Sequence, residues 1–339
     1  MKLKMKVKMK IRDVMMHRFS CILASTVVAL LPALALAQSW SPTKTITFVV
    51  PVAPGSSNDL IARMLSERLP AKLGQAVIVD NRPGASGLVG AASVARSAPD
   101  GHTIVIVPSD VYMAPILTPK AGGANFDVIK DFTPILTAGS APVLIVVSPS
   151  INVKTPQELV AYLKKNGPTS YGSPGTGSPM NIAGEMFKRS TGTQLNHVPY
   201  RGVSPAVNAV LSGELPMSIV SLAGAAPHIA VGKLLPVALV EKQRSELIPN
   251  LHTLTESGIP GVETTVFFQI LAPAGTPAPV IQRLNAEINA ILTTPDFKER
   301  LRTMGVQPAG GTSADAAKLA RDTYARNQQL VKELHIVAE

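Results

Sequence analysis

Short apolar runs alternate with segments of helical periodicity along most of the chain. The first run lies at 46–50, and the apolar residues from 58 to 69 then recur three and four positions apart. Similar short runs follow at 76–79, 102–107, 143–147, 195–198, 217–220, 236–240 and 263–272. Strands that alternate with helices are typical of an α/β fold with largely parallel sheets. We therefore predict a fold of this class.

Helix signals separate these runs. Helices are predicted at 86–97, 110–117, 155–165, 205–211, 227–231 and 280–292, with a last one after Thr312. The helix at 155–165 has the clearest start, because Thr155 can cap it and Glu158 can close a capping box. The segment 118–125 predicts a loop. Two strands, 143–147 and 263–272, are candidates for segments that cross between domains.

The first strand ends in a turn at the start of the first predicted helix. Ser56, with Asp59 three residues later, matches a capping box, although Ser57 or Asn58 can also serve as the cap. Free backbone N–H groups at a helix start attract an anion, and the helix dipole reinforces this attraction. An ordinary capped turn would contain the same residue types, so the residues alone leave both interpretations open.

A second junction of the same kind lies at 169–190. Ser178 can cap the helix, and Pro179 fits its first turn. Gly172, Gly175 and Gly177 leave the backbone bare where a ligand can approach closely. The alternative interpretation is a glycine-rich surface loop.

Residues 1–37 have the pattern of a secretory signal peptide. A basic segment precedes an apolar run from Cys21 to Leu36, and the run ends in an A-x-A cleavage pattern. Met15 or Met16 is an alternative translation start that would give a signal of ordinary length. We therefore expect an exported protein that resides in the periplasm.

Removal of the signal peptide changes the charge and the cysteine count. It takes away seven of the 32 basic residues and one of the 22 acidic residues, so the net charge falls from +10 to +4. The remaining basic residues do not cluster with aromatic ones, which argues against nucleic-acid binding. The single cysteine also leaves. No second apolar run reaches the roughly 18 residues that a membrane span needs.

The usual catalytic motifs do not occur in the chain. G-x-S-x-G, GxxxxGK[ST], H-E-x-x-H and a G-x-G-x-x-G after a strand are all missing. His102, His197, His228, His252 and His335 are scattered without metal-ligand spacing, and we interpret them as structural or surface residues. The serines of the glycine-rich turns have no local base. We expect a binding protein without cofactor or metal, not an enzyme.

A set of motifs in a fixed order resembles one protein family. The motifs are PVAPGSSNDLIAR (51–63), VDNRPGASG (79–87), APDGHT (98–103), KDFTPI (130–135), GEMF (184–187), HVPYRG (197–202), PHI (227–229) and LAPAGTP (271–277). Together they resemble the substrate-binding proteins of tripartite tricarboxylate transporters, also called Bug-type periplasmic receptors. The resemblance covers nearly all of the chain after residue 37.

The resemblance implies a fold, a ligand and a partner. The fold is the two-lobed type II periplasmic-binding-protein fold, with a ligand cleft between the lobes and two crossing segments. Lobe 1 would comprise 40–139 and 266–339, and lobe 2 would comprise 140–265. The ligand would be a small organic carboxylate, delivered to a membrane permease of one large and one small subunit. The implied ligand-binding residues are Ala53, Gly55, Ser56, Ser57, Asp59, Ser109, Ser173, Gly175, Thr176, Gly177, Ser178, Asn181 and Ser221.

The chain departs from the family pattern at three places. The usual Gly-Gly of the first turn is Gly55-Ser56, and a common histidine of the second turn is Asn181. A frequent Asp-Asn pair falls at Val220-Ser221, which removes a carboxylate and predicts a pocket less suited to an amine. These departures favour a dicarboxylate, or an aromatic acid beside Phe267 and Phe268. Plain core packing is the alternative role of the two phenylalanines.

Three functions remain distinguishable by experiment. The first is a monomeric receptor that delivers a carboxylate to a permease. The second is a receptor that presents its ligand-bound form to a membrane sensor such as a sensor kinase. The third is an exported carboxylate-processing enzyme, against which the missing catalytic motifs argue.

Overall fold

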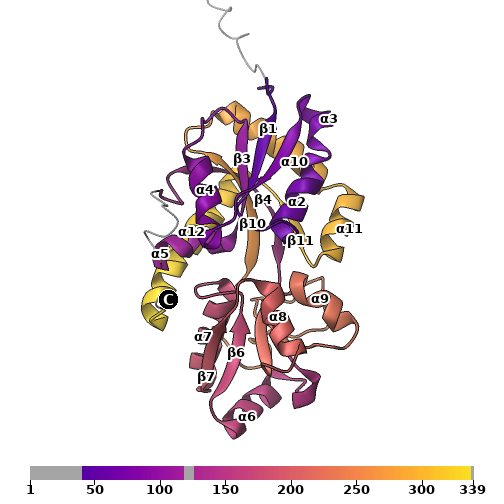
Figure 1. Cartoon of the computed structure of the whole chain (residues 1–339), viewed down its shortest axis with the longest axis vertical. Coiled ribbons are helices and arrows are strands. Elements are labelled where there is room, and N and C mark those ends of the chain that lie inside the picture. The colour runs from indigo at the N-terminus through magenta and orange to yellow at the C-terminus, as the bar shows by residue number, and fades with distance from the viewer. Residues whose placement is uncertain (1–39, 118–125, 337–339) are drawn as a thin grey trace, which may run out of the picture. The chain divides into compact units, whose positions relative to one another are not determined.

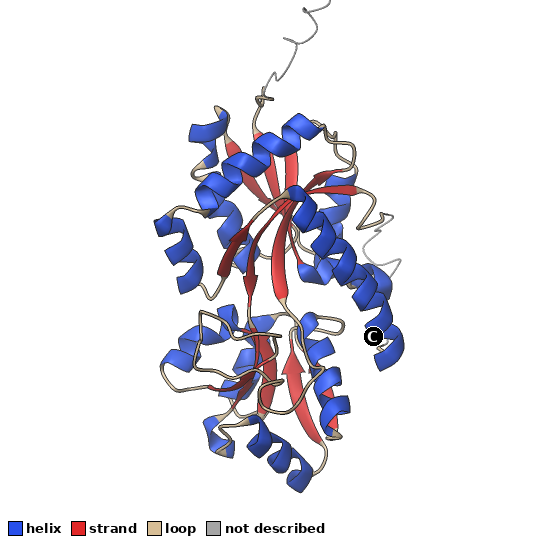
Figure 2. Cartoon of the chain, turned by 180° about the vertical axis from the view of Figure 1, so that it is seen from behind, coloured by secondary structure: helices blue, strands red, loops and turns tan. Residues whose placement is uncertain are grey.

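The computed structural model describes residues 40–117 and 126–336, so the predicted signal peptide and the predicted loop at 118–125 lie outside the described residues. The chain from Ser41 onward forms one compact unit. Its strands form two separate sheets, and helices pack against each of them (Figure 1, Figure 2).

The first sheet has six strands in the order β11-β4-β10-β3-β1-β2. The strands are β1 (Ile46–Val50), β2 (Val77–Asn81), β3 (Thr103–Pro108), β4 (Phe132–Ala141), β10 (Val266–Pro273) and β11 (Gln307–Gly310). The β1 strand is parallel to both of its neighbours, whereas β10 is antiparallel to β3 and β4, and β11 is antiparallel to β4. This sheet therefore has two parallel and three antiparallel strand pairs.

The second sheet has five strands in the order β7-β6-β8-β5-β9. The strands are β5 (Val143–Val147), β6 (Thr169–Ser173), β7 (Leu195–Pro199), β8 (Met217–Ser221) and β9 (Leu235–Leu239). The β6 strand is parallel to β7 and β8, whereas β5 is antiparallel to β8 and β9. The expectation of largely parallel sheets is therefore wrong for one side of each sheet.

The chain passes from one sheet to the other at two adjacent places. Strand β4 of the first sheet leads through Pro142 into β5 of the second, and the chain returns from β9 into β10. Ala141 pairs with Val266, so the two passages lie side by side (Figure 1). The sequence assigned a crossing to 143–147, but this run is an inner strand of the second sheet, with neighbours on both sides. The predicted return at 263–272 coincides largely with β10.

Helices flank both sheets. Beside the first sheet lie α2 (Ser57–Ser66), α3 (Leu69–Leu73), α4 (Leu88–Ala95), α5 (Ala114–Leu117), α10 (Ala278–Leu292), α11 (Pro295–Thr303) and α12 (Ser313–Leu334). Beside the second lie α6 (Pro156–Asn166), α7 (Pro179–Thr191), α8 (Val203–Leu211) and α9 (Leu222–Ala230). Short 3₁₀ helices are η2 (Ala85–Gly87), η3 (Ser109–Tyr112) and η5 (Pro149–Ile151).

Each sheet has its own hydrophobic core. One buried cluster includes Val49, Val105 and Leu271 of the first sheet, and the other includes Leu144 and Val220 of the second. Each fully buried side chain of this size contributes about 1.5 to 3 kcal/mol relative to an exposed one. Since each sheet is stabilised by its own core, the residues at the passages between the sheets are free to form a binding site.

Candidate functional site

The first helix-start turn has a cap that matches only half of the predicted capping box. Ser56 is the cap of α2, because its hydroxyl accepts the N–H of Asp59 at 3.3 Å. The Asp59 carboxylate does not return a bond to the N–H of Ser56. It accepts the N–H of Gly55 at 2.9 Å instead. Ser57 and Asn58 are not the cap, and the Asn58 amide instead donates to the carbonyl of Ile106 at 3.2 Å.

Asp59 brings a negative charge of the chain itself to this helix start. Its side chain is 2 % exposed and accepts from Arg63 Nε at 3.0 Å and from Asn81 Nδ2 at 2.9 Å. Burial opposes ionisation, but the hydrogen bonds from Arg63, from the Gly55 N–H and from Asn81 outweigh it and lower the pKa of the carboxyl. An incoming anion would therefore meet an ionised carboxylate beside the free N–H groups of the first turn.

The second turn repeats the same cap with a neutral residue. Ser178 caps α7 and accepts the N–H of Asn181 at 3.1 Å, while Asn181 Oδ1 accepts the N–H of Gly177 at 2.9 Å. The Asn181 amide then donates to the Tyr171 hydroxyl at 3.0 Å, which lies 3.0 Å from Glu185 Oε1. The N-terminal end of α7 thus keeps its positive dipole without a carboxylate in the cap.

A buried serine and a histidine form hydrogen bonds that hold the second turn in place. Ser173 is fully buried, and its hydroxyl lies 2.7 Å from His197 Nε2 and accepts the N–H of Gly175 at 3.3 Å. The statement that no base lies near these serines is therefore wrong for Ser173. Because its hydroxyl has no access to solvent and lines neither cavity described below, the pair holds the Gly175 backbone in place.

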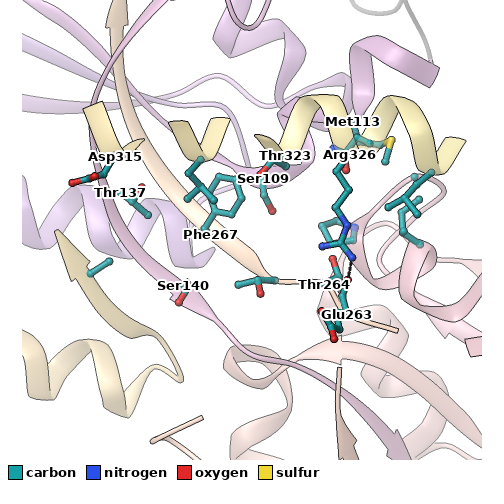
Figure 3. A pocket seen from close by; sticks show the side chains of 18 residues that line it. Ser109, Met113, Thr137, Ser140, Glu263, Thr264, Phe267, Asp315, Thr323 and Arg326 are labelled. Carbon is teal, nitrogen blue, oxygen red and sulfur yellow. Dashed lines mark hydrogen bonds between the residues drawn. The ribbon is translucent and has the colours of Figure 1, made fainter. Parts of the chain in front are cut away.

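Two adjoining cavities lie where the second turn meets the segments near the passages between the sheets. The larger has a volume of about 480 Å³ and is lined by Ser109, Thr264, Phe267, Arg326 and other residues of α7, β10 and α12 (Figure 3). The smaller has a volume of about 300 Å³, and its lining residues include Ser86, Asp110 and residues 174–178. Met113 and Gly177 line both, so the two cavities share a wall.

Each cavity has a buried hydroxyl without a partner. Ser109 lines the larger cavity and is 3 % exposed, and Thr176 lines the smaller one. Neither hydroxyl oxygen has a hydrogen-bond partner among the described residues. A buried polar group without a partner costs about 1 to 3 kcal/mol. A ligand or a bound water that reaches these hydroxyls would recover this cost.

Charge is distributed unequally over the two cavities. Arg326 of α12 reaches into the larger cavity and donates to the carbonyl of Glu263 at 2.6 Å (Figure 3). The smaller cavity has one charged lining residue among those described, Asp110. Burial raises the pKa of the Asp110 carboxyl to about 6.

The aromatic pair of β10 has two different roles. Phe267 lines the larger cavity (Figure 3). Its ring lies 5.9 Å, between centroids, from that of Tyr112. Phe268 is 4 % exposed and does not line either cavity. Successive side chains of a strand point to opposite faces, which accounts for the difference.

The structure brings only part of the predicted site together. Ser109 and Gly177 line the larger cavity, and Gly175, Thr176, Gly177 and Ser178 line the smaller one. Ser173 and Asn181 stand behind this wall, and Ser221 precedes α9 without a side-chain cap bond. The first-turn residues line neither of these two cavities; they are Ala53, Gly55, Ser56, Ser57 and Asp59.

The lining residues that sequence reasoning missed include Ser86, Asp110 and Arg326, and the first two carry recognisable signals. Ser86 lies in the VDNRPGASG motif, at a positive φ of 53° that marks an unusual turn. Asp110 follows the carboxyl end of β3, where ligands of open α/β sheets bind. Arg326 lies with other lining residues in the last helix, far along the chain from Ser109 and Gly177, and its sequence neighbours carry no signal.

The described residues hold neither a metal-binding cluster nor a membrane span. No group of three or more His, Cys, Asp and Glu side chains is placed to hold a metal ion among them. No helix in the same part of the chain is long and apolar enough to cross a bilayer.

The two-sheet architecture is shared with solved periplasmic binding proteins. Residues 61–336 match the family model described as the tripartite tricarboxylate transporter family receptor. The chain belongs to this family, whose members are substrate-binding receptors and not enzymes. The resemblance, the fold class and the expectation of a non-enzyme are therefore confirmed.

Individual relatives agree over nearly their whole length. Protein BugT of Bordetella pertussis is 31% identical over 293 residues, which are 86% of this chain and 90% of BugT. The R. palustris protein Rpa4515, solved with adipate, has a TM-score of 0.79 and 31% identity, over 87% of this chain and 99% of that one. MatC from Rhodopseudomonas palustris, solved with bound malate, has a TM-score of 0.75 and 28% identity, over 86% and 99%.

Proposed function

We propose that this protein captures a small organic carboxylate in the periplasm and delivers it to a tripartite tricarboxylate-type permease. The single observation that carries the proposal is the pair of cavities at the start of α7, where unpartnered hydroxyls and an uncompensated helix dipole meet. Family membership supports the role in transport. A helix start of this kind favours an anionic ligand.

A ligand without an amino group is the finer part of the proposal. The relatives solved with adipate and malate support it, because both compounds are dicarboxylates without nitrogen. At the place of the lost Asp-Asn pair, Val220 is fully buried in the core of the second sheet and Ser221 precedes α9. Phe267 in the larger cavity supports an aromatic acid as the second choice.

A thermal-shift screen of the purified protein tests the ligand class. The panel contains mono-, di- and tricarboxylates, aromatic acids and amino acids. A ligand at 100 times its Kd adds about 2.7 kcal/mol to the free energy of unfolding. For a chain approaching this size, that corresponds to a rise of roughly 5 to 10 °C. No shift with any carboxylate would refute the proposal.

Two variants test where the carboxylate binds. Ser178→Leu should abolish the shift, because Ser178 both caps α7 and lines the smaller cavity. Ser57→Leu places the same side chain at the start of α2, outside both cavities. If both variants bind as the wild type does, the ligand does not use the α7 turn.

Delivery to the permease needs its own experiment. The large and small permease subunits of the same organism, in lipid nanodiscs, should bind the ligand-loaded protein more tightly than the ligand-free protein. Transport of the labelled ligand into proteoliposomes should depend on both the permease and this protein. If the ligand-loaded protein binds a sensor domain and not the permease, the delivery part of the proposal is wrong.

A further inference from the structure

Asp110 is a carboxylate in the wall of a cavity that we propose to hold another carboxylate. It lies in the first turn of η3, directly after Ser109, and lines the smaller cavity together with the second turn. The other lining residues that the structure describes there carry no charge. A ligand anion in this cavity would therefore come close to the Asp110 side chain without a cation between them.

No described residue compensates the charge of Asp110. Burial is the only influence that shifts the pKa of its carboxyl, and this influence raises the pKa to about 6. Neighbouring cations or hydrogen-bond donors would lower it instead. The ordinary value is 3.8, so a substantial fraction of the free protein already carries the proton in mildly acidic solution.

The elements that pack against η3 bring few charges to this place. They are β3, η2, α5, β10 and α12, and the first four contain no Asp, Glu, His, Lys or Arg. From α12, Asp315 and Arg326 line the adjoining larger cavity with Ser109. Thr312 caps α12, the Asp315 carboxylate accepts the N–H and the hydroxyl of Thr312, and Arg326 donates to the Glu263 carbonyl. Tyr112 of η3 itself donates to the Gln269 amide oxygen.

Two carboxylates that share one site cannot both ionise without a large cost, and one of them takes up a proton. A protonated carboxyl can then donate a short hydrogen bond to the other, ionised one. The Thr176 hydroxyl, which has no partner among the described residues, is a second donor in the same wall. Once Asp110 is neutral, the smaller cavity therefore offers two hydrogen-bond donors to an anion, the Asp110 carboxyl and the Thr176 hydroxyl.

We propose that Asp110 is a ligand-binding residue that holds a proton and donates it in a hydrogen bond to a carboxylate of the ligand. This inference rests on the proposed function and adds that binding is coupled to the uptake of one proton. The direction of the pH dependence follows from the coupling between proton uptake and ligand binding. Above the pKa of free Asp110 the proton must be taken from solution on binding, so affinity falls as pH rises; below it the proton is already present, and the dependence flattens.

Titration calorimetry with adipate and with malate between about pH 6 and 8.5 tests the proposal. Carboxylic acids of this kind titrate mostly below this range, at roughly 4 to 5. We expect the Kd to rise about tenfold per pH unit above pH 7, and the heats in two buffers of different ionisation enthalpy to show one proton taken up per ligand.

The variant Asp110→Asn separates the proton from the charge. Its carboxamide donates a hydrogen bond at any pH, so binding should become independent of pH and exceed that of the wild type at least tenfold at pH 8.5. Asp322→Asn removes the same charge from an exposed site on α12 and should keep the wild-type slope. Thermal unfolding without ligand verifies that both variants are folded.

Several results would overturn the inference. A flat pH profile of the wild type, or proton release on binding, would show that Asp110 does not share a proton with the ligand. Preferential binding of amino acids that Asp110→Asn weakens would make Asp110 the counter-ion of an ammonium group. In both cases a carboxylate still binds, so the receptor role stands; preferential binding of amino acids would, however, contradict the proposal of a ligand without an amino group. If no carboxylate binds at any pH, the proposed function fails as well.

Discussion

The turns at the starts of α2 and α7 are built alike and differ in one charge. In both, a glycine with positive φ precedes a capping serine, and the third residue after the serine accepts the N–H of the glycine. That residue is the ionised Asp59 in the first turn and the neutral Asn181 in the second. Only the second turn lines the two cavities.

This difference shows that a capped helix start is not by itself an anion-binding site. Asp59 already neutralises part of the dipole of α2, and Arg63 with Asn81 completes a closed set of bonds. Asn181 satisfies the same glycine N–H without adding charge, so the dipole of α7 stays available. The following variants test this contrast, from the largest expected effect to the smallest.

Removal of Asp59 should have the largest effect on stability. Asp59→Ala leaves the Gly55 N–H without its acceptor, whereas the Asn81 amide keeps its bond to the Val52 carbonyl. A hydrogen bond to a charged group contributes about 1.5 to 3 kcal/mol. Arg63 is half-exposed, so its ion pair adds little. We expect a loss of about 2 to 3 kcal/mol in urea unfolding, and about 1 to 2 kcal/mol for the matched Asn181→Ala.

A second substitution at this position, Asp59→Asn, tests the charge through the pH dependence of stability. Because the folded-state pKa of Asp59 is lowered, its contribution to stability is complete above the unfolded value of about 4 and is lost as pH falls below it. The gap between wild type and Asp59→Asn should therefore be widest near neutral pH and should close in acid. A gap that does not change with pH would show that the charge of Asp59 contributes nothing.

The two glycines separate backbone strain from ligand binding. Gly55 and Gly177 have φ values of 82° and 75°, and alanine at either should cost about 1 kcal/mol of stability. A Cβ at Gly177 would lie 2.0 Å from Leu117 Cδ1, whereas one at Gly55 would meet nothing. Gly177→Ala should therefore lower ligand affinity about tenfold, or 1.4 kcal/mol, by displacing Leu117 in the cavity wall.

Calorimetry with the best ligand of the screen measures both glycine variants. Gly55→Ala is the control, since it has the same strain outside the cavities. Equal losses of affinity in both would show that the turns act together on the ligand.

The sequence predicted those elements correctly whose signals lie within a few neighbouring residues. Ser56, Thr155 and Ser178 each cap a helix, and the complete capping box is formed at Thr155 but only half formed at Ser56, because capping depends on residues three positions apart. The strands β1 and β5 coincide with the predicted runs at 46–50 and 143–147. The starts of these elements needed no knowledge of the rest of the fold.

Sequence reasoning failed where the outcome depends on distant parts of the chain. Strand β4 was not predicted, because its burial alternates irregularly and only its pairing with β10 and β11 defines it. Helix α9 begins at Leu222, before the predicted start at 227, because Pro227 is tolerated inside it. Which helix start faces a cavity likewise depends on Met113 and Leu117, which no local pattern connects to Gly177.

The cap serines should have a smaller and nearly equal effect on stability. Ser56→Ala and Ser178→Ala each remove one hydrogen bond to a backbone N–H, at a cost of about 1 kcal/mol. Only Ser178→Ala should also weaken ligand binding, by a few fold, because Ser178 lines the smaller cavity. A larger affinity loss in Ser56→Ala would reverse the assignment of the two turns.

Tyr171→Phe should have the smallest effect, and it tests how rigidly the second turn must be held. The change deletes the hydroxyl that accepts from the Asn181 amide and contacts Glu185, but the ring stays packed 5.1 Å, between centroids, from that of His197. We expect a loss of about 0.5 to 1.5 kcal/mol in unfolding and an affinity within threefold of the wild type, because Asn181 keeps its bond to the Gly177 N–H. Tyr200→Phe removes a hydroxyl that bonds the exposed Glu214 and is the matched control. An affinity loss of tenfold in Tyr171→Phe alone would mean that the Tyr171 hydroxyl, and not the cap of α7, sets the geometry of the binding wall.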